Sequence, residues 1–257
     1  MQKTIEFEID QPKFAAALHA AVSVADRRSS NQPILASVLL RADAHGLSMT
    51  ATDMQVSVRE VLDAAAISHG GVCVNIAHLL NVVRSLPAKP LRVKGLDNHW
   101  ISVKTGRSEF KLMGQGPGDF PEIPEADKTC AWTVVPCAGL RDAIDRTMFS
   151  VSTDEARTNL NGLYIESTGQ RMTAVSTDGH RLTKLTAEAP FPKTDKIIIP
   201  RRGLAELRKF IDKRPGEVAM ASNGPSGHLF VRAGQAHLSI KLNNVVFPPY
   251  EQVIPKN

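Results

Sequence analysis

The sequence predicts an α+β protein in which one module, two helices packed on an antiparallel sheet, occurs twice in tandem. Two observations predict this arrangement. Short motifs recur in the same order in the two halves of the chain, and within each half the apolar residues alternate between strand and helix periodicity. At 257 residues the chain can hold two domains of ordinary size.

The repeat has a nearly constant period. Matching residues are 125, 125 and 127 positions apart in three pairs: Asp53 and Asp178, Leu79 and Leu204, Phe120 and Phe247. Chance similarity would not keep this order with so little drift. We therefore expect a first domain over residues 1–126 and a second over residues 127–257.

Each half opens with an alternating strand, at residues 4–9 and 129–135, followed by a helix. Apolar residues at helical spacing predict the first helix of each half: Phe14, Leu18 and Val22, then Leu140, Ile144 and Met148. The second helix is predicted in the same way: Leu79, Val83 and Leu86, then Leu204, Leu207 and Ile211. Two alternating strands close each half, at 100–103 and 109–113, then at 228–231 and 237–242.

Composition narrows the class of protein. The net charge of +5 and the pI of about 9.2 favour an anionic partner. The three cysteines form no C-x-x-C pair, so we expect reduced thiols, no zinc site and a cytoplasmic location. The N-terminus has no secretory signal pattern, and no apolar run reaches the ~18 residues of a membrane span.

Several motifs, taken in order, resemble the β subunit of bacterial DNA polymerase III, the sliding clamp. They are Pro33-Ile34-Leu35, Thr52-Asp53, Asn161-Gly162, the run from Thr177 to Leu182, Phe247-Pro248, and the stretch from Val253 to Asn257. The family has three such domains per chain and closes as a ring of six domains from two chains. The resemblance covers the first two domains, and the third is expected to be absent.

The resemblance implies a processivity factor that encircles duplex DNA without reading its sequence and needs no cofactor or metal. Such a ring requires cations near the phosphates. Basic residues on or beside the predicted helices are the candidates: Lys13, Arg27, Arg28, Arg84, Arg141, Arg146, Arg201 and Arg202. The alternative is that these residues form the solvated faces of amphipathic helices. Clamps of this family are often acidic overall, so the basic pI is a departure.

The family also binds short linear peptides of DNA polymerase III, the clamp loader and repair proteins in one groove. By position, the groove would comprise Leu160, Thr177, Gly179, His180, Arg181, Leu182, Pro248 and Val253. Residues read alone would make Asp178-Gly179 a hairpin turn. The first half keeps Thr52-Asp53 but has no Gly-His-Arg after it, so the shared pair is interpreted as structural and the extension as functional. The family commonly has a basic residue where this chain has Gln252.

Ring closure is the third surface that the resemblance implies, as a homo-oligomer formed when all domains are present. The corresponding positions are Val82, Arg107, Phe110 and Leu112. Phe110 and Leu112 alternate along one strand and therefore share a face, which would alternatively be the core face.

An enzyme is the competing class. His180 lies near Asp178 and Ser176, but neighbours along a strand do not converge as a triad, and no nucleophile elbow is present. No phosphate-binding loop and no metal-ligand spacing occur, so any DNA-directed DNA polymerase activity is expected to belong to the holoenzyme. Two more hypotheses fit the sequence: a two-domain clamp that closes as a trimer, and a truncated regulatory paralogue that binds clamp partners without encircling DNA.

Overall fold

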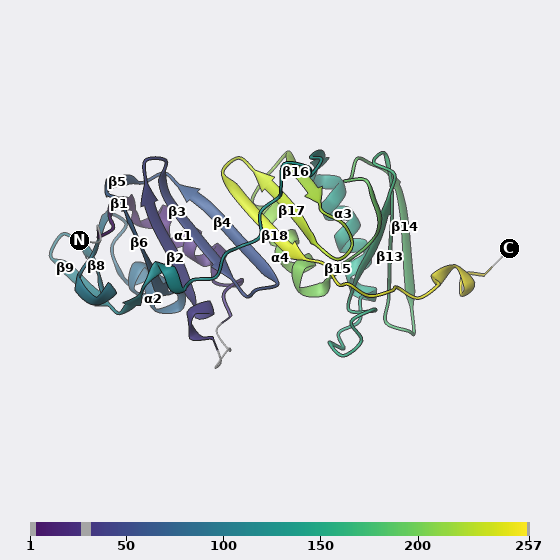
Figure 1. Ribbon diagram of the computed structural model, residues 1–257, viewed down its shortest axis with the longest axis horizontal. Helices are drawn as coiled ribbons and strands as arrows, with labels where there is room; N and C mark the ends of the chain where they lie inside the picture. The colour runs from purple at the N-terminus through teal and green to yellow at the C-terminus, as the bar shows by residue number, and fades with distance from the viewer. Residues whose placement is uncertain (1–3, 27–31, 256–257) are drawn as a thin grey trace. The chain divides into compact units, whose positions relative to one another are not determined.

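The computed structural model describes residues 4–26 and 32–255. The chain divides into two compact units, Met1–Ile123 (unit 1) and Pro124–Asn257 (unit 2). In Figure 1, unit 1 runs from purple to teal and unit 2 from teal to yellow.

Unit 1 contains two antiparallel sheets and two helices. The first sheet has the order β5 (Ala65–Ser68), β1 (Glu6–Asp10), β7 (Pro90–Gly95), β8 (Ile101–Thr105) and β9 (Ser108–Leu112). In the second sheet the unit contributes β10 (Gly114–Gln115), β6 (Gly70–Asn75), β2 (Ser37–Asp43), β3 (Gly46–Thr52) and β4 (Val56–Leu62). The helices are α1 (Gln11–Ala21) and α2 (Ile76–Ser85).

Unit 2 repeats this plan. One run of strands has the order β18 (Ala236–Lys241), β17 (His228–Ala233), β16 (Glu217–Ser222) and β11 (Thr133–Pro136). The other has the order β14 (Leu182–Glu188), β13 (Arg171–Thr177), β12 (Gly162–Ser167) and β15 (Thr194–Pro200). The helices are α3 (Cys137–Thr147) and α4 (Arg201–Asp212).

The two units share strand order as well as sequence motifs. The order β1-β7-β8-β9 in unit 1 corresponds to β11-β16-β17-β18 in unit 2, and β6-β2-β3-β4 corresponds to β15-β12-β13-β14. The two added strands of unit 1 are the short β5 and β10, each at one end of its run of strands. The chain is therefore a tandem duplication of one α+β module.

The helices form where sequence periodicity predicts them. Leu204, Leu207 and Ile211 of α4 are fully buried, which is the apolar face expected from their spacing. The α2 helix begins after Asn75, whose side-chain oxygen accepts hydrogen bonds from the N–H groups of Ala77 and His78 at 3.1 Å each.

Every helix contacts strands of both sheets of its own unit, so the core of each unit lies between its sheets and helices. In unit 1 the rings of Phe7 and Phe14 pack edge to face in this core, with centroids 6.0 Å apart. In unit 2 the helix–strand contact is close at one glycine. A Cβ on Gly203 of α4 would lie 2.3 Å from Ile240 of β18, so only glycine allows this approach.

Three further observations concern the cysteines, the length of the helices and the metal-ligating side chains. All three cysteines are free; Cys73 and Cys137 are buried and Cys130 is partly exposed. No helix among the described residues is long and apolar enough to cross a membrane. The described part of the chain also contains no group of three metal-ligating side chains.

Candidate functional site

Five of the predicted peptide-binding residues, Thr177 and Gly179–Leu182, lie in or at the ends of the turn that joins β13 to β14 in unit 2. The Thr177 hydroxyl accepts from the Gly179 N–H at 3.1 Å and donates to the Arg181 carbonyl at 2.7 Å. The Asp178 carboxylate accepts from the N–H groups of His180 and Arg181 at 3.0 and 3.1 Å. Gly179 has a φ of 93°, the left-handed region that glycine adopts without strain. The turn thus presents exposed His180 and Arg181 side chains on a rigid base.

The hydrogen bonds of this turn favour the ionised form of Asp178. Hydrogen bonds from the His180 N–H, then from the Arg181 N–H and guanidinium, lower the pKa of the Asp178 carboxyl to about 2. The Arg181 Nε donates to Asp178 Oδ2 at 2.9 Å. The same guanidinium lies over the ring of Phe149, 5.7 Å from its centroid.

An aromatic cluster lies next to the first residue of β14. Tyr164 of β12 stacks on Phe247 with ring centroids 4.8 Å apart, and Tyr250 lies 5.9 Å from Tyr164. The partly buried Leu182 packs against this cluster. Burial, reinforced by a hydrogen bond to Glu166, raises the pKa of the Tyr164 phenol above its usual value. The cluster fixes the segment that carries Pro248, which lies between Phe247 and Tyr250.

The remaining predicted residues flank this centre. Leu160 is half-buried and lies in the segment after the short helix at Met148–Ser150, and Val253 is 69% exposed after the turn at Tyr250–Gln252. The guanidinium of Arg157, in the same segment as Leu160, lies 3.8 Å from the position that a Cβ on Gly179 would take. We call the set Leu160, Thr177, Gly179–Leu182, Pro248 and Val253 the peptide surface.

Sequence reasoning missed two side chains at this surface. Phe149 is an apolar ring that is 57% exposed, and Arg157 lies beside the Gly179 turn. Phe149 directly follows Met148, which the spacing assigned to the preceding helix. The structure instead ends α3 at Thr147 and begins a 3-10 turn at Met148, which exposes the ring. The sequence offered one clue, because Phe149 directly follows Met148 and so lies off the apolar face of the predicted helix.

The buried Ser176 has a structural role. Its hydroxyl donates to the Thr147 carbonyl at 2.7 Å, and Asp178 receives main-chain N–H groups instead of an imidazole. Ser176, Asp178 and His180 therefore do not form the chain of hydrogen bonds that a triad requires.

The predicted DNA-contacting cations that the structure describes lie on paired helices in each unit, since α1 contacts α2 and α3 contacts α4. In unit 1, Lys13 forms an ion pair with Asp63 at 3.0 Å, and Arg84 Nη2 is 2.9 Å from His19 Nδ1. Arg27 and Arg28 lie outside the described residues.

In unit 2 the predicted cations are engaged with neighbouring groups. Arg141 pairs with Asp212 at 3.0 Å, Arg146 with Asp142 at 2.7 Å, and Arg202 with Glu206 at 2.8 Å. Arg201 differs from these three, because its Nη1 donates to the main-chain carbonyls of Met148 and Val151 at 3.2 and 3.1 Å.

Comparison with known proteins agrees with this architecture. Residues 5–124 match the N-terminal domain of the DNA polymerase III beta subunit, and residues 134–249 match its central domain. The beta sliding clamp of Pseudomonas aeruginosa is 32% identical over 256 residues, which covers 98% of this chain and 68% of that protein. The chain belongs to the β sliding clamp family.

Solved sliding clamps share the fold. That of Caulobacter crescentus superposes with a TM-score of 0.91 at 30% identity and covers 98% of this chain and 69% of the clamp. A Pseudomonas aeruginosa clamp bound to griselimycin gives a TM-score of 0.88 at 31% identity, covering 98% of this chain and 68% of that one. This chain thus spans about two thirds of the sliding clamps that it matches.

The ring-closure residues predicted for a sliding clamp lie at one edge of unit 1. Strand β9 is the last strand of its sheet and carries Phe110 and Leu112, opposite the buried Val103 and Ile101 of β8. The α2 helix, which carries Val82, contacts β9, and Arg107 lies exposed in the β8–β9 turn. Phe110 is 41% exposed, so α2 leaves part of its apolar ring uncovered.

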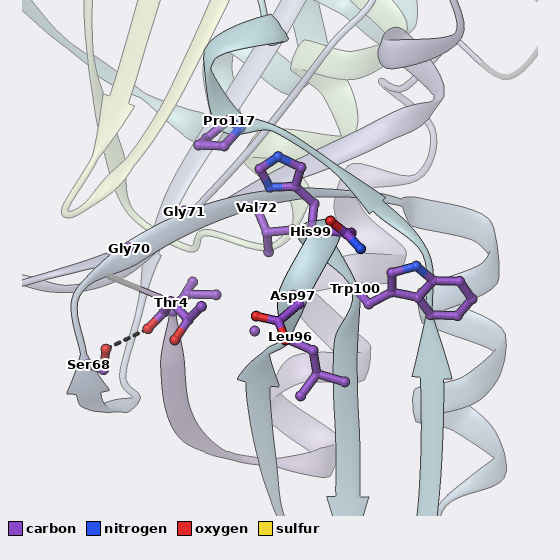
Figure 2. A pocket seen from close by; sticks show the side chains of 13 residues that line it. Thr4, Ser68, Gly70, Gly71, Val72, Leu96, Asp97, His99, Trp100 and Pro117 are labelled. Carbon is purple, nitrogen blue, oxygen red and sulfur yellow. Dashed lines mark hydrogen bonds between the residues drawn. The ribbon is translucent and has the colours of Figure 1, made fainter. Parts of the chain in front are cut away.

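Unit 1 also contains a pocket of about 900 Å³, shown in Figure 2. The connection from β7 to β8 supplies Asp97 and His99, and the Ser68 hydroxyl donates to the Thr4 carbonyl at 2.5 Å on another wall. His99 has a φ of 63°, in the left-handed region. None of the predicted site residues lines this pocket.

Proposed function

We propose that this chain acts as a processivity factor: as part of a ring, it encircles duplex DNA and tethers the replicative DNA polymerase and other clamp-binding proteins. Membership of the sliding clamp family supports the proposal. The observation that carries it is the repetition of a cation-bearing helix pair, α1 with α2 and α3 with α4, in both units.

The DNA contact proposed here is electrostatic and independent of sequence. Arg84, Arg146 and Arg202 are side chains at least partly exposed on these helices, and they could exchange their protein partners for phosphate oxygens. The ion pair of Arg146 with Asp142 is exposed and therefore weak, so its exchange for phosphate costs little. Glu206, the partner of Arg202, is buried, and after such an exchange it would keep its ion pair with Lys209 at 2.9 Å.

Topology gives the sharpest test of encirclement. A clamp loaded by its clamp loader onto circular DNA should stay bound, and cutting the circle once should release it from the free ends. Equal retention on circular and linear DNA would reject encirclement. Replacement of Arg202 with Ala should shorten retention equally on unrelated sequences and reduce the salt slope by ~0.9 if one phosphate contact is lost. The mass in solution, measured at several concentrations, distinguishes a trimer, a larger ring and a monomer.

The partner site proposed is the peptide surface of unit 2, which would take linear segments of the polymerase, the clamp loader and repair proteins. Apolar Leu160, Leu182, Pro248 and Val253 offer contacts for a partner's aliphatic or aromatic anchors. Griselimycin, present in the Pseudomonas aeruginosa clamp structure, is a suitable probe. We expect it to shift the NMR signals of His180 and Leu182 but not those of Gln55 in the matching turn of unit 1. The opposite pattern would reject the assignment.

A further inference from the structure

We infer that Arg201 is a positioning residue of the peptide surface, which fixes one segment of unit 2 and does not contact DNA phosphate. The inference rests on the peptide-binding function proposed above. Its basis is the unusual set of partners of this arginine. The other predicted cations of unit 2 all pair with carboxylates: Arg141, Arg146 and Arg202.

Arg201 holds both ends of the segment 148–161. At the start of the segment, its Nη1 donates to the carbonyls of Met148 and Val151 at 3.2 and 3.1 Å. At the end of the segment, its main-chain N–H donates to the Asn161 carbonyl at 3.1 Å. The two ends are also joined directly, since Asn161 Nδ2 donates to the Ser152 carbonyl at 2.9 Å. Arg201 therefore closes this segment into a loop anchored on the first residue of α4.

This loop carries three side chains at the peptide surface. Leu160 is a predicted contact, Phe149 lies under the Arg181 guanidinium, and Arg157 lies beside Gly179. A binding surface keeps its geometry only if the residues behind it fix the groups that touch the ligand. Loss of the Arg201 side-chain hydrogen bonds would free the start of the segment, which carries Phe149, while the main-chain bond to Asn161 remains. The loosening would reach Leu160 through Ser152, whose N–H donates to the Leu160 carbonyl at 3.1 Å.

The repeat supplies an internal comparison. The residue 125 positions before Arg201 is Ile76, which is likewise the first residue of its helix and is fully buried in unit 1. A phosphate contact at this position would be equally useful in both units of a ring. An arginine that serves the peptide surface is needed only in unit 2, where that surface is proposed. Arginine therefore occurs at this position in the unit for which the peptide surface is proposed, and isoleucine occurs in the unit for which it is not.

The two roles place different demands on the side chain. A phosphate contact needs a positive charge, which lysine also provides. Two carbonyls on one nitrogen need the fixed, planar donors and the full reach of the guanidinium, which the lysine ammonium lacks. The variant Arg201→Lys thus preserves the charge and removes the geometry.

The experiment compares the wild type, Arg201→Lys and the control Arg202→Lys in griselimycin affinity, amide hydrogen exchange and DNA retention. We expect Arg201→Lys to weaken griselimycin binding about tenfold, the equivalent of one lost hydrogen bond to a charged group. The Ser152 and Leu160 amides, which bond to carbonyls within this loop, should exchange faster. Retention on circular DNA should stay unchanged, and Arg202→Lys should leave griselimycin affinity unchanged.

Three outcomes overturn the inference: unchanged exchange at Ser152 and Leu160, unchanged griselimycin affinity when the wild type binds, or a loss of DNA retention without a loss of peptide affinity. A wild type that does not bind griselimycin contradicts the proposed peptide surface instead, and the exchange result still tests the loop. If the Arg201→Lys variant does not fold, a measurement on the wild type alone tests whether the Arg201 guanidinium is bound to the loop. The Arg201 Nη protons of the wild type should then exchange slowly with solvent, and fast exchange overturns the assignment.

Discussion

Met54 and Gly179 occupy the same position in the two repeats, 125 residues apart, and both have a left-handed backbone, with φ of 70° and 93°. In each turn the N–H of this residue donates to the hydroxyl of the threonine two positions earlier. The N–Oγ1 distance is 3.0 Å from Met54 to Thr52 and 3.1 Å from Gly179 to Thr177.

The aspartate of each turn acts alike. Asp53 accepts from the N–H groups of Gln55 and Val56 at 2.9 and 2.7 Å, as Asp178 does from the two residues that follow Gly179. These bonds support the interpretation of the shared Thr-Asp pair as structural. They also show that the backbone conformation belongs to the turn itself, because it persists where the glycine is replaced by methionine.

Replacement of Gly179 with Ala should destabilise unit 2 by about 1 kcal/mol, because a Cβ is disfavoured at positive φ. Urea unfolding measures this change. The matched control is Gly139→Ala in α3, where the residue is exposed and an added Cβ meets nothing within 4 Å. That substitution should instead stabilise the protein by about 0.5–1 kcal/mol, since alanine favours the helix. Equal signs for the two variants would contradict the argument.

The Asp178 carboxyl should titrate with a pKa of about 2 in the folded protein, as measured by NMR. Its folded pKa lies below the value of about 3.9 in an unfolded chain. The carboxylate therefore contributes to stability above about pH 4, and that contribution is lost as the pH falls towards 2. Replacement of Asp178 with Asn should flatten the fall in stability over this range. A midpoint near the unfolded value would show that the turn does not hold the carboxylate.

Replacement of Phe110 with Ala should cost unit 1 about 1 kcal/mol or less in an isolated chain, because the ring is already 41% exposed. Its effect should appear in assembly, measured by sedimentation with a full-length clamp. Phe14, fully buried in the same unit, is the control, and Phe14→Ala should cost about 3–5 kcal/mol. A loss of ~3 kcal/mol or more from Phe110→Ala would mark this ring as core.

Both tyrosines of the chain, Tyr164 and Tyr250, should resist ionisation in the folded state. Burial is the main cause that raises the pKa of each phenol, and the hydrogen bond to Glu166 adds to it for Tyr164. Phenolate absorbance should therefore rise near pH ~10 only after unfolding. Because the folded state keeps protons that the unfolded chain releases, stability should decrease as the pH rises above ~10. A native titration that matches the denatured one would contradict burial of both rings.

The sequence predicted the helices and the repeat well, for a physical reason. Helical spacing identified Leu204, Leu207 and Ile211 as a buried face because burial of one face is what the 3.6-residue period records. Alternation identified strands in the same way, but the strand predicted at 129–135 begins only at Thr133. The reason is a turn in which Asp127 accepts the N–H groups of Thr129 and Cys130. Alternation does not record which strands pair, so the division of each unit's strands between two sheets came only from the structure.

The site was predicted less completely, because its polar contacts join residues that are distant in the sequence. Arg141 pairs with Asp212 across two helices, and Arg201 bonds to carbonyls about 50 positions earlier. Basic spacing alone cannot distinguish an arginine available to phosphate from one that holds a loop. The Gly179 turn was easier to identify, because its repeat partner separated the shared framework from the unit-2 extension.

The unequal burial of the three thiols has a practical consequence. Desolvation raises the pKa of Cys73 to about 12, and Cys137 is also buried, so neither offers appreciable thiolate to a maleimide at neutral pH. Cys130 is partly exposed, in a turn where Asp127 accepts its N–H at 3.2 Å. Desolvation and the nearby Asp127 also raise the pKa of the Cys130 thiol, so exposure and not acidity makes it the preferred attachment point for a fluorophore among residues 1–257. A label at this position would report on the proposed DNA binding without a change to the two buried cysteines.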